Sequence, residues 1–233
     1  MVITTKRKGA PVRRAYGFDQ RGPWIRRHIG GGRWGCNLIS AALGAALLAA
    51  CATVATNTLS PQEIAGLKLT AVAVTYKPDA QIQWDDGLRL YAESKGLNYL
   101  QLPAGVTPEE QTFMRDALAR KLKEAMTKDL GATLHGSRPV RLDVAVIRFD
   151  ITSPLQRVVL GGGYSMNADV NVVDARTGAV LLAYPNVNTI LMAGNGVAGA
   201  AVQAIIDANQ PAADRVIDSF ASQYAKWLAE RPT

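Results

Sequence analysis

Residues 166–184 read MNADVNVVDARTGAVLLAY, and this pattern predicts two antiparallel strands joined by a tight turn. In the first half, apolar side chains alternate with polar ones, which is typical of a strand with one buried face. The segment from Asp174 to Gly178 then supplies an aspartate, a threonine and a glycine that can adopt positive φ, and such residues favour a hairpin turn. Ala179 to Tyr184 is the expected returning strand.

Two further strands are expected before this hairpin. Residues 139–149 alternate between apolar and polar side chains, which predicts a strand with one buried face. Residues 67–76, LKLTAVAVTY, are apolar on both alternation phases, as in an interior strand of a covered sheet that ends at Lys77-Pro78-Asp79. A short helix is expected over residues 85–94, and two C-terminal helices over 197–208 and 212–230.

Thr107-Pro108-Glu109-Glu110 is the clearest helix start in the chain. The threonine can cap the helix, proline suits the first helical position, and Glu110 completes a capping box. The helix should end near Gly131. The resulting order of strand, helix, three strands and helix predicts an α+β fold, with a mostly antiparallel sheet and two helices packed on one face.

The N-terminal region carries an export signal in front of a cysteine. Nine basic side chains within residues 1–33 precede an uncharged apolar run, Leu38 to Ala50. At Leu48-Ala49-Ala50-Cys51 the chain resembles a bacterial lipoprotein, in which these residues form the lipobox read by signal peptidase. The resemblance implies cleavage between Ala50 and Cys51, a thioether-linked diacylglyceryl group on the cysteine, and acylation of the new amino terminus by a chain such as palmitate.

This interpretation divides the chain into three parts. Residues 1–50 would be a cleaved lipoprotein signal peptide, 51–62 a lipidated N-terminus with a flexible tether, and 63–233 a single periplasmic α+β domain. Ala52 follows the cysteine instead of the aspartate often found in lipoproteins retained in the inner membrane, which implies an outer-membrane anchor facing the periplasm. An alternative stays open, because the weakly polar run continues through Ala55 and is long enough for a single N-in span.

Charge and cysteine content narrow the function classes. The whole chain has a net charge of +7, but residues 51–233 hold 17 basic against 18 acidic side chains, which argues against nucleic-acid binding. Cys36 lies in the leader and Cys51 would be lipidated, so no disulfide is expected.

Catalytic and cofactor chemistry has few candidates in this composition. His135 is the single histidine after the leader, and we expect it to be an exposed loop residue with no metal or cofactor bound. The adjacent pairs Asp85-Asp86 and Glu109-Glu110 leave an envelope hydrolase that uses carboxylates as the alternative to a non-enzymatic protein.

The hairpin carries a second resemblance. The string NVVDARTGAVL, residues 171–181, follows a glycine-rich connection and precedes a C-terminal helix. It resembles the hairpin of uncharacterised periplasmic lipoproteins that are similar in fold to the curli-secretion lipoprotein and to lipoprotein activators of penicillin-binding proteins. The resemblance implies a lipid-anchored, non-enzymatic component that binds an envelope protein or associates with itself.

The segment from Leu155 to Tyr164 is the predicted partner contact. An apolar run here leads into three glycines that lack the lysine of a phosphate loop. Hydrophobic loops outside a core are usually interfaces. The predicted contact residues are Val158, Val159, Gly161, Gly162, Gly163 and Tyr164. A second candidate surface is the small-residue run Gly196 to Ala201.

Lipidation of Cys51 is directly testable. We expect the membrane-extracted protein to begin at Cys51 and to carry added acyl mass, as measured by intact mass spectrometry. The Cys51→Ser variant should lose membrane attachment, because the other cysteine lies in the leader. A chain that retains residues 1–50 would contradict the signal-peptide interpretation.

Overall fold

The computed structural model describes residues 56–151, 153, 162–192 and 196–230, without the side chains of residues 196, 197, 200 and 204. These residues belong to one compact unit, which begins at Ala52. Leu48, Ala49, Ala50, Cys51, Val158, Val159 and Gly161 lie outside the described part. The elements are α1 (Pro61–Gly66), β1 (Leu67–Trp84), α2 (Asp85–Ser94), the 3-10 helix η1 (Tyr99–Gln101), α3 (Pro108–Gly131), β2 (Arg138–Ile151), β3 (Gly163–Asp174), β4 (Val180–Met192), α5 (Gly196–Asn209) and α6 (Ala212–Ala229).

A four-stranded sheet in the order β1-β2-β3-β4 organises the fold. β1 and β2 are parallel, whereas the β2–β3 and β3–β4 pairs are antiparallel. The α+β class is therefore confirmed, and the expected mostly antiparallel sheet is more fully described as mixed. The parallel pair is possible because α3 carries the chain back along the sheet between β1 and β2.

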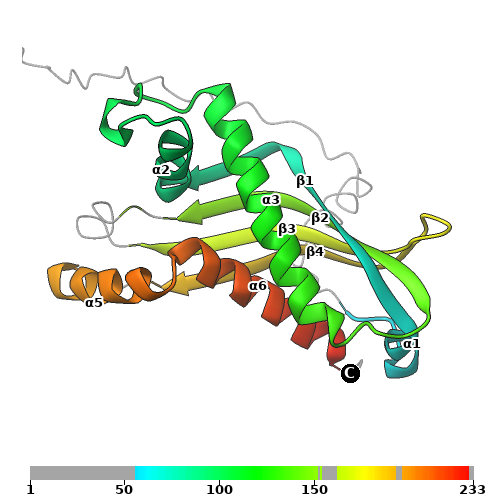
Figure 1. The fold of residues 1–233 in the computed structure, drawn as a ribbon. Coiled ribbons are helices and arrows are strands. Elements are labelled where there is room, and N and C mark those ends of the chain that lie inside the picture. The colour runs from blue at the N-terminus through cyan, green and yellow to red at the C-terminus, as the bar shows by residue number, and fades with distance from the viewer. Residues whose placement is uncertain (1–55, 152, 154–161, 193–195, 231–233) are drawn as a thin grey trace, which may run out of the picture. The chain divides into compact units, whose positions relative to one another are not determined.

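α3 and α6 lie side by side across one face of the sheet (Figure 1). Alternate side chains of β2 and β3 point into this contact and are fully buried. The helices supply matching apolar stripes, which include Leu118, Leu122 and Met126 of α3 and Val216, Phe220 and Leu228 of α6. Each such side chain contributes about 1.5–3 kcal/mol by leaving water. This layer is the hydrophobic core of the domain.

The start of α3 is formed by the predicted capping box. The Thr107 side chain accepts a hydrogen bond from the Glu110 amide, and the Glu110 carboxylate accepts one from the Thr107 amide at 2.7 Å. α3 ends at Gly131, as expected.

β1 differs from its sequence-based prediction. The stretch 67–76 was expected in the interior of a covered sheet, but β1 is an edge strand and most of its apolar side chains are only partly buried. The strand also continues past Pro78 to Trp84, with a break in register between Tyr76 and Gln81. An edge strand tolerates proline because its outward N–H groups need no partner. Apolar residues on both phases therefore did not identify a central strand.

The hairpin between β3 and β4 forms as predicted. The Gly178 amide donates to the Asp174 carbonyl at 2.9 Å, and Gly178 adopts φ of 75°. The Asp174 carboxylate accepts hydrogen bonds from the amides of Arg176 and Thr177 and from the Arg138 guanidinium. The guanidinium, followed by the two amides, lowers the pKa of Asp174 to about 2. β4 is longer than expected and reaches Met192 through a register shift.

The two ends of the sheet differ in what surrounds them. β1, β2 and β4 run in the same direction, so their last residues lie at one end, where α2 and α5 follow. The described chain begins at the opposite end beside α1 (Figure 1). There, Asn57 donates a hydrogen bond to the Leu228 carbonyl near the end of α6, at 2.9 Å. We call the two ends the α1 end and the α5 end.

Gly178→Val should destabilise the protein by on the order of 1 kcal/mol or more, measured by denaturant unfolding. An added Cβ at this position meets no atom within 4 Å, so the cost would come from the positive φ alone. Ala175→Ser in the same exposed turn should have little effect. Equal unfolding midpoints for the two variants would contradict the role of Gly178.

Asp174→Asn should lower the melting temperature at pH 7, because the charged hydrogen bond with Arg138 is lost. The carboxyl pKa is about 2 in the folded protein and about 3.9 in an unfolded chain. Its stabilising effect is thus present above pH 4 and disappears as the pH falls towards 2. The melting temperatures of the two proteins should converge over that range.

The exposed Asp79 provides the control for this experiment. Asp79→Asn should leave the melting temperature nearly unchanged at every pH. A constant difference between Asp174→Asn and the parent protein down to pH 2 would show that the carboxylate charge does not stabilise the hairpin.

Candidate functional site

The structure describes three of the six predicted contact residues, and one of them is buried. Gly162 directly precedes β3, Gly163 is its first residue, and both are partly exposed. Tyr164 is only 1% exposed, so its assignment as a partner contact is corrected. The glycine at 163 has a structural reason, because an added Cβ would come within 2.5 Å of the Leu191 carbonyl oxygen on β4.

Tyr164 instead belongs to a polar cluster that fastens α5 to the rest of the domain. Its hydroxyl donates to an Asp207 carboxylate oxygen at 3.0 Å. The other oxygen accepts hydrogen bonds from Gln203, at 2.9 Å, and from Arg215 of α6. The Arg215 guanidinium also lies 5.3 Å from the centre of the Tyr164 ring. These contacts connect α5 to β3 and α6.

The opposite side of α5 is apolar and faces solvent. Its exposed residues follow the spacing i, i+3, i+4, i+7 and i+8, which places them on one helical face. We call this face the α5 surface, and it consists of Ala198, Ala201, Val202, Ile205 and Ile206. The sequence of α5 contains one charged residue, Asp207, which is held in the polar cluster. Such a face normally packs against a core, so its exposure makes it a candidate contact surface.

The small residues at the start of α5 were the second predicted surface. Ala198 and Ala201 are exposed and belong to the α5 surface, whereas the side chains of Gly196, Val197 and Ala200 are not among those described. The absence of charged residues from one face of this helix could have indicated an exposed apolar surface. The small residues were instead interpreted as a sign of close helix packing.

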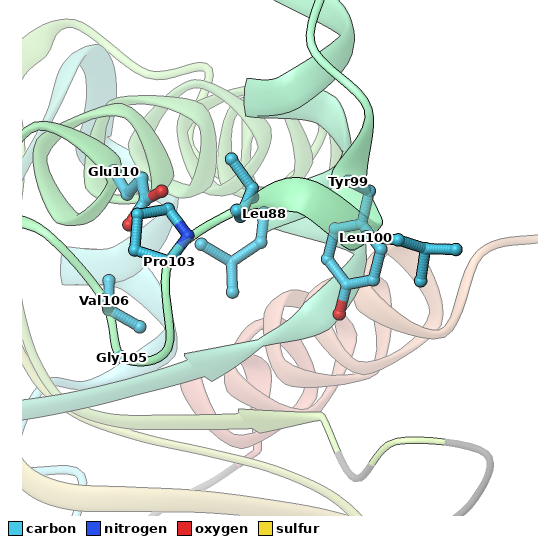
Figure 2. Close-up of a pocket in the computed structure, with 8 residues that line it drawn as sticks. Leu88, Tyr99, Leu100, Pro103, Gly105, Val106 and Glu110 are labelled. Carbon is cyan, nitrogen blue, oxygen red and sulfur yellow. The ribbon is translucent and has the colours of Figure 1, made fainter.

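A second feature at the α5 end of the sheet is a pocket of about 320 Å³ beside α2. Its wall is formed by α2, η1, the loop before α3 and the first turn of α3 (Figure 2). The lining residues are Leu88, Tyr99, Leu100, Leu102, Pro103, Gly105, Val106 and Glu110. Gly105 adopts φ of 93°, a conformation that favours glycine in this turn. Leu100 is 85% exposed and stands at the rim.

The carboxylates considered for hydrolysis lie in different surroundings. Glu110 is the one carboxylate in the pocket wall. Glu109 forms an ion pair with Lys95 at 2.7 Å, and the hydrogen bond from Lys95 lowers the pKa of Glu109. A general acid needs a raised pKa instead. Asp86 lies 4.0 Å from Arg89 on the surface of α2.

His135 is exposed, as expected, and its Nδ1 lies 2.9 Å from the Ala132 carbonyl oxygen. In the described part of the chain, no three His, Cys, Asp or Glu side chains come together in a way that could hold a metal ion. Within those same residues, no helix has the length and hydropathy needed to cross a membrane.

These features define an α+β domain with a mixed four-stranded sheet, two covering helices and an exposed apolar helix at one end. Residues 114–233 match the family of unknown function DUF6778, and the chain belongs to that family. The match runs from α3 to the end of the chain, so it includes the hairpin, α5 and α6. No curated protein matches the sequence.

The comparison with solved structures found matches of low sequence identity and low TM-score. A Caulobacter crescentus CB15 protein provisionally described as a lipoprotein is 17% identical, with a TM-score of 0.29, and the match covers 48% of this chain and 80% of that one. A Xanthomonas campestris protein of family DUF330 is 10% identical, with a TM-score of 0.37 and coverage of 75% and 89%. The PelC dodecamer of Paraburkholderia phytofirmans, in a variant form, is 15% identical, with a TM-score of 0.31 and coverage of 68% and 87%. We carry over no functional residue from these proteins.

Proposed function

We propose that this protein is a lipid-anchored, non-enzymatic binding or assembly component of the bacterial envelope. Acylated Cys51 would hold it in the outer membrane, with the domain facing the periplasm. The run Leu48-Ala49-Ala50-Cys51 behind a basic and apolar leader supports the anchor, and Ala52 supports the outer membrane. Three acyl chains exceed the two signals needed for stable attachment. Density-gradient fractionation tests the placement, since recovery with inner-membrane markers would contradict it.

The position of the α5 surface relative to the proposed anchor supports a role in binding a partner. Cys51 precedes Thr56, the first described residue, by five positions, and those residues span at most about 18 Å when extended. With Cys51 acylated, the α1 end would be the tethered end. The α5 end lies a full strand length away, about 40 Å for the 12 residues of β3. The α5 surface would thus project away from the anchor.

The exposed α5 surface is the observation that carries the proposed function. Val202 is 59% exposed and Ile205 is 66% exposed, with no charged residue on that face. Helices that lie on membranes usually carry Lys or Arg along the polar side, and the α5 sequence contains neither. The surface therefore suits a protein partner better than an anionic lipid layer. That partner is an envelope protein or a second copy of this chain.

Replacing Val202 and Ile205 by glutamine tests the surface. Both side chains are exposed on a helix, and glutamine is a good helix former, so the melting temperature should change little. Cross-linking in intact membranes should then recover less of the partner than it does with the parent protein. Loss of the partner without loss of folding is the expected result.

Val180 offers a matched control because it is 58% exposed, close to the 59% of Val202, and lies at the α1 end of β4. Val180→Gln should leave cross-linking unchanged. Equal cross-linking by the control and the α5 variant would contradict a role for the α5 surface. A cross-linked mass of twice the chain would identify the partner as a second copy.

A further inference from the structure

The chain contains the same helix-capping motif twice, in two different surroundings. At α1, the Ser60 amide donates to Glu63 Oε2 at 2.8 Å, and at α3 the Thr107 amide donates to Glu110 Oε2 at 2.7 Å. Both motifs also contain the reciprocal hydrogen bond from the glutamate amide to the cap side chain. Glu63 is exposed, whereas Glu110 is only 2% exposed. Capping therefore does not require the burial of Glu110.

Glu110 is buried and also lines the pocket. Leu102, Pro103 and Val106, in the loop before α3, line the pocket together with Glu110 and with Leu88 of α2 (Figure 2). Glu110 and Pro103 both line the pocket and are labelled in Figure 2. Burying a carboxylate among apolar groups is unfavourable unless a partner compensates its charge. The Thr107 amide is the one hydrogen-bond donor found for this carboxylate among the described residues.

Glu109 has a cationic partner, whereas Glu110 does not have one among the described residues. Glu109 is exposed and already has its own cation, the Lys95 ammonium at 2.7 Å. Within the described part of the chain, no lysine or arginine forms an ion pair with Glu110. The more buried of the two adjacent carboxylates is thus the one without a counter-ion. A positively charged ligand would supply it.

We propose that this pocket binds a small alkylammonium ligand. The ammonium group would lie against the free oxygen of Glu110, and the alkyl chain would pack against Leu88, Leu102 and Val106. A volume of about 320 Å³ is at the lower end of ligand pockets and fits a chain of a few carbons. The site is separate from the α5 surface and does not depend on the proposed function.

The chemistry of the wall excludes other ligand classes. A carboxylate or phosphate ligand would place like charges together at Glu110. A divalent metal ion needs several oxygen or nitrogen ligands, and this pocket offers one carboxylate. A neutral alcohol of the same shape would gain the apolar contacts without the charged hydrogen bond, so it should bind more weakly than the amine.

Titration of the full-length protein in a nonionic detergent tests the proposal. Hexylamine at neutral pH is the probe, with 1-hexanol as the neutral analogue and hexanoate as the anionic analogue, and isothermal calorimetry gives the affinities. We expect hexylamine to bind at least 10-fold more tightly than 1-hexanol, and hexanoate not to bind. Absence of hexylamine binding, or equal affinity for the amine and the alcohol, would overturn the proposal.

Glu110→Gln and Glu63→Gln form a matched pair. Glutamine is also accepted in a capping box, so both variants keep the helix start and lose one negative charge. Glu110→Gln should reduce the affinity for hexylamine at least 10-fold, while Glu63→Gln should bind as the parent does. Equal losses in the two variants, or no loss in either, would show that the pocket is not the binding site.

A third variant covers the case in which Glu110→Gln does not fold. Val106 lines the pocket in a loop and is 49% exposed, so Val106→Phe can be accommodated while its ring occupies the pocket. This variant keeps Glu110 and should lose hexylamine binding. Binding that survives the filling of the pocket would overturn the proposal.

Discussion

The contact between one face of the sheet and the helices α3 and α6 is the interaction on which the rest of the domain depends. Buried side chains of β2 and β3 pack against apolar stripes from both helices. The two helices also contact one another, so neither could move without exposing part of the core. The hairpin, the edge strands and α1 are attached to this layer. α2 and α5 lie at one end of the sheet, where Tyr91 of α2 packs against Phe113 of α3 and Asp207 of α5 is held by Tyr164 and Arg215.

The local parts of the fold could be predicted from the sequence because their signals are local. The capping box at Thr107 and Glu110 predicts the start of α3 from hydrogen bonds within one turn, and Gly178 predicts the hairpin from its allowed φ. The position of β1 at the sheet edge could not be predicted, because the order of strands depends on residues far away in the chain. The lipobox remains a sequence-based prediction, since Cys51 lies outside the described residues.

The candidate surfaces were harder to predict from the sequence. Tyr164 follows a glycine-rich stretch and looked like part of a loop, but β3 begins at Gly163 and turns the ring into the core. The capping motif accounts for a glutamate at position 110, so the sequence carried no separate sign that Glu110 lines a pocket. The loop from Leu102 to Val106, which lines the same pocket, shows no periodicity in its sequence. Glu63 and Glu110 occupy the same position in two capping boxes, and only the structure shows that Glu63 is exposed and Glu110 is buried.

The parallel pairing of β1 with β2 has a consequence for how the chain folds. Leu67 pairs with Arg138, whereas the hairpin residues Val173 and Val180 lie close together in the chain. Joining distant segments costs more loop-closure entropy than forming a local turn, and non-local pairing slows folding. The β3–β4 hairpin and α3 can therefore form early, while β1 docks late. The pocket lies between α2, which follows β1, and the start of α3, so it would be completed only in the last step of folding.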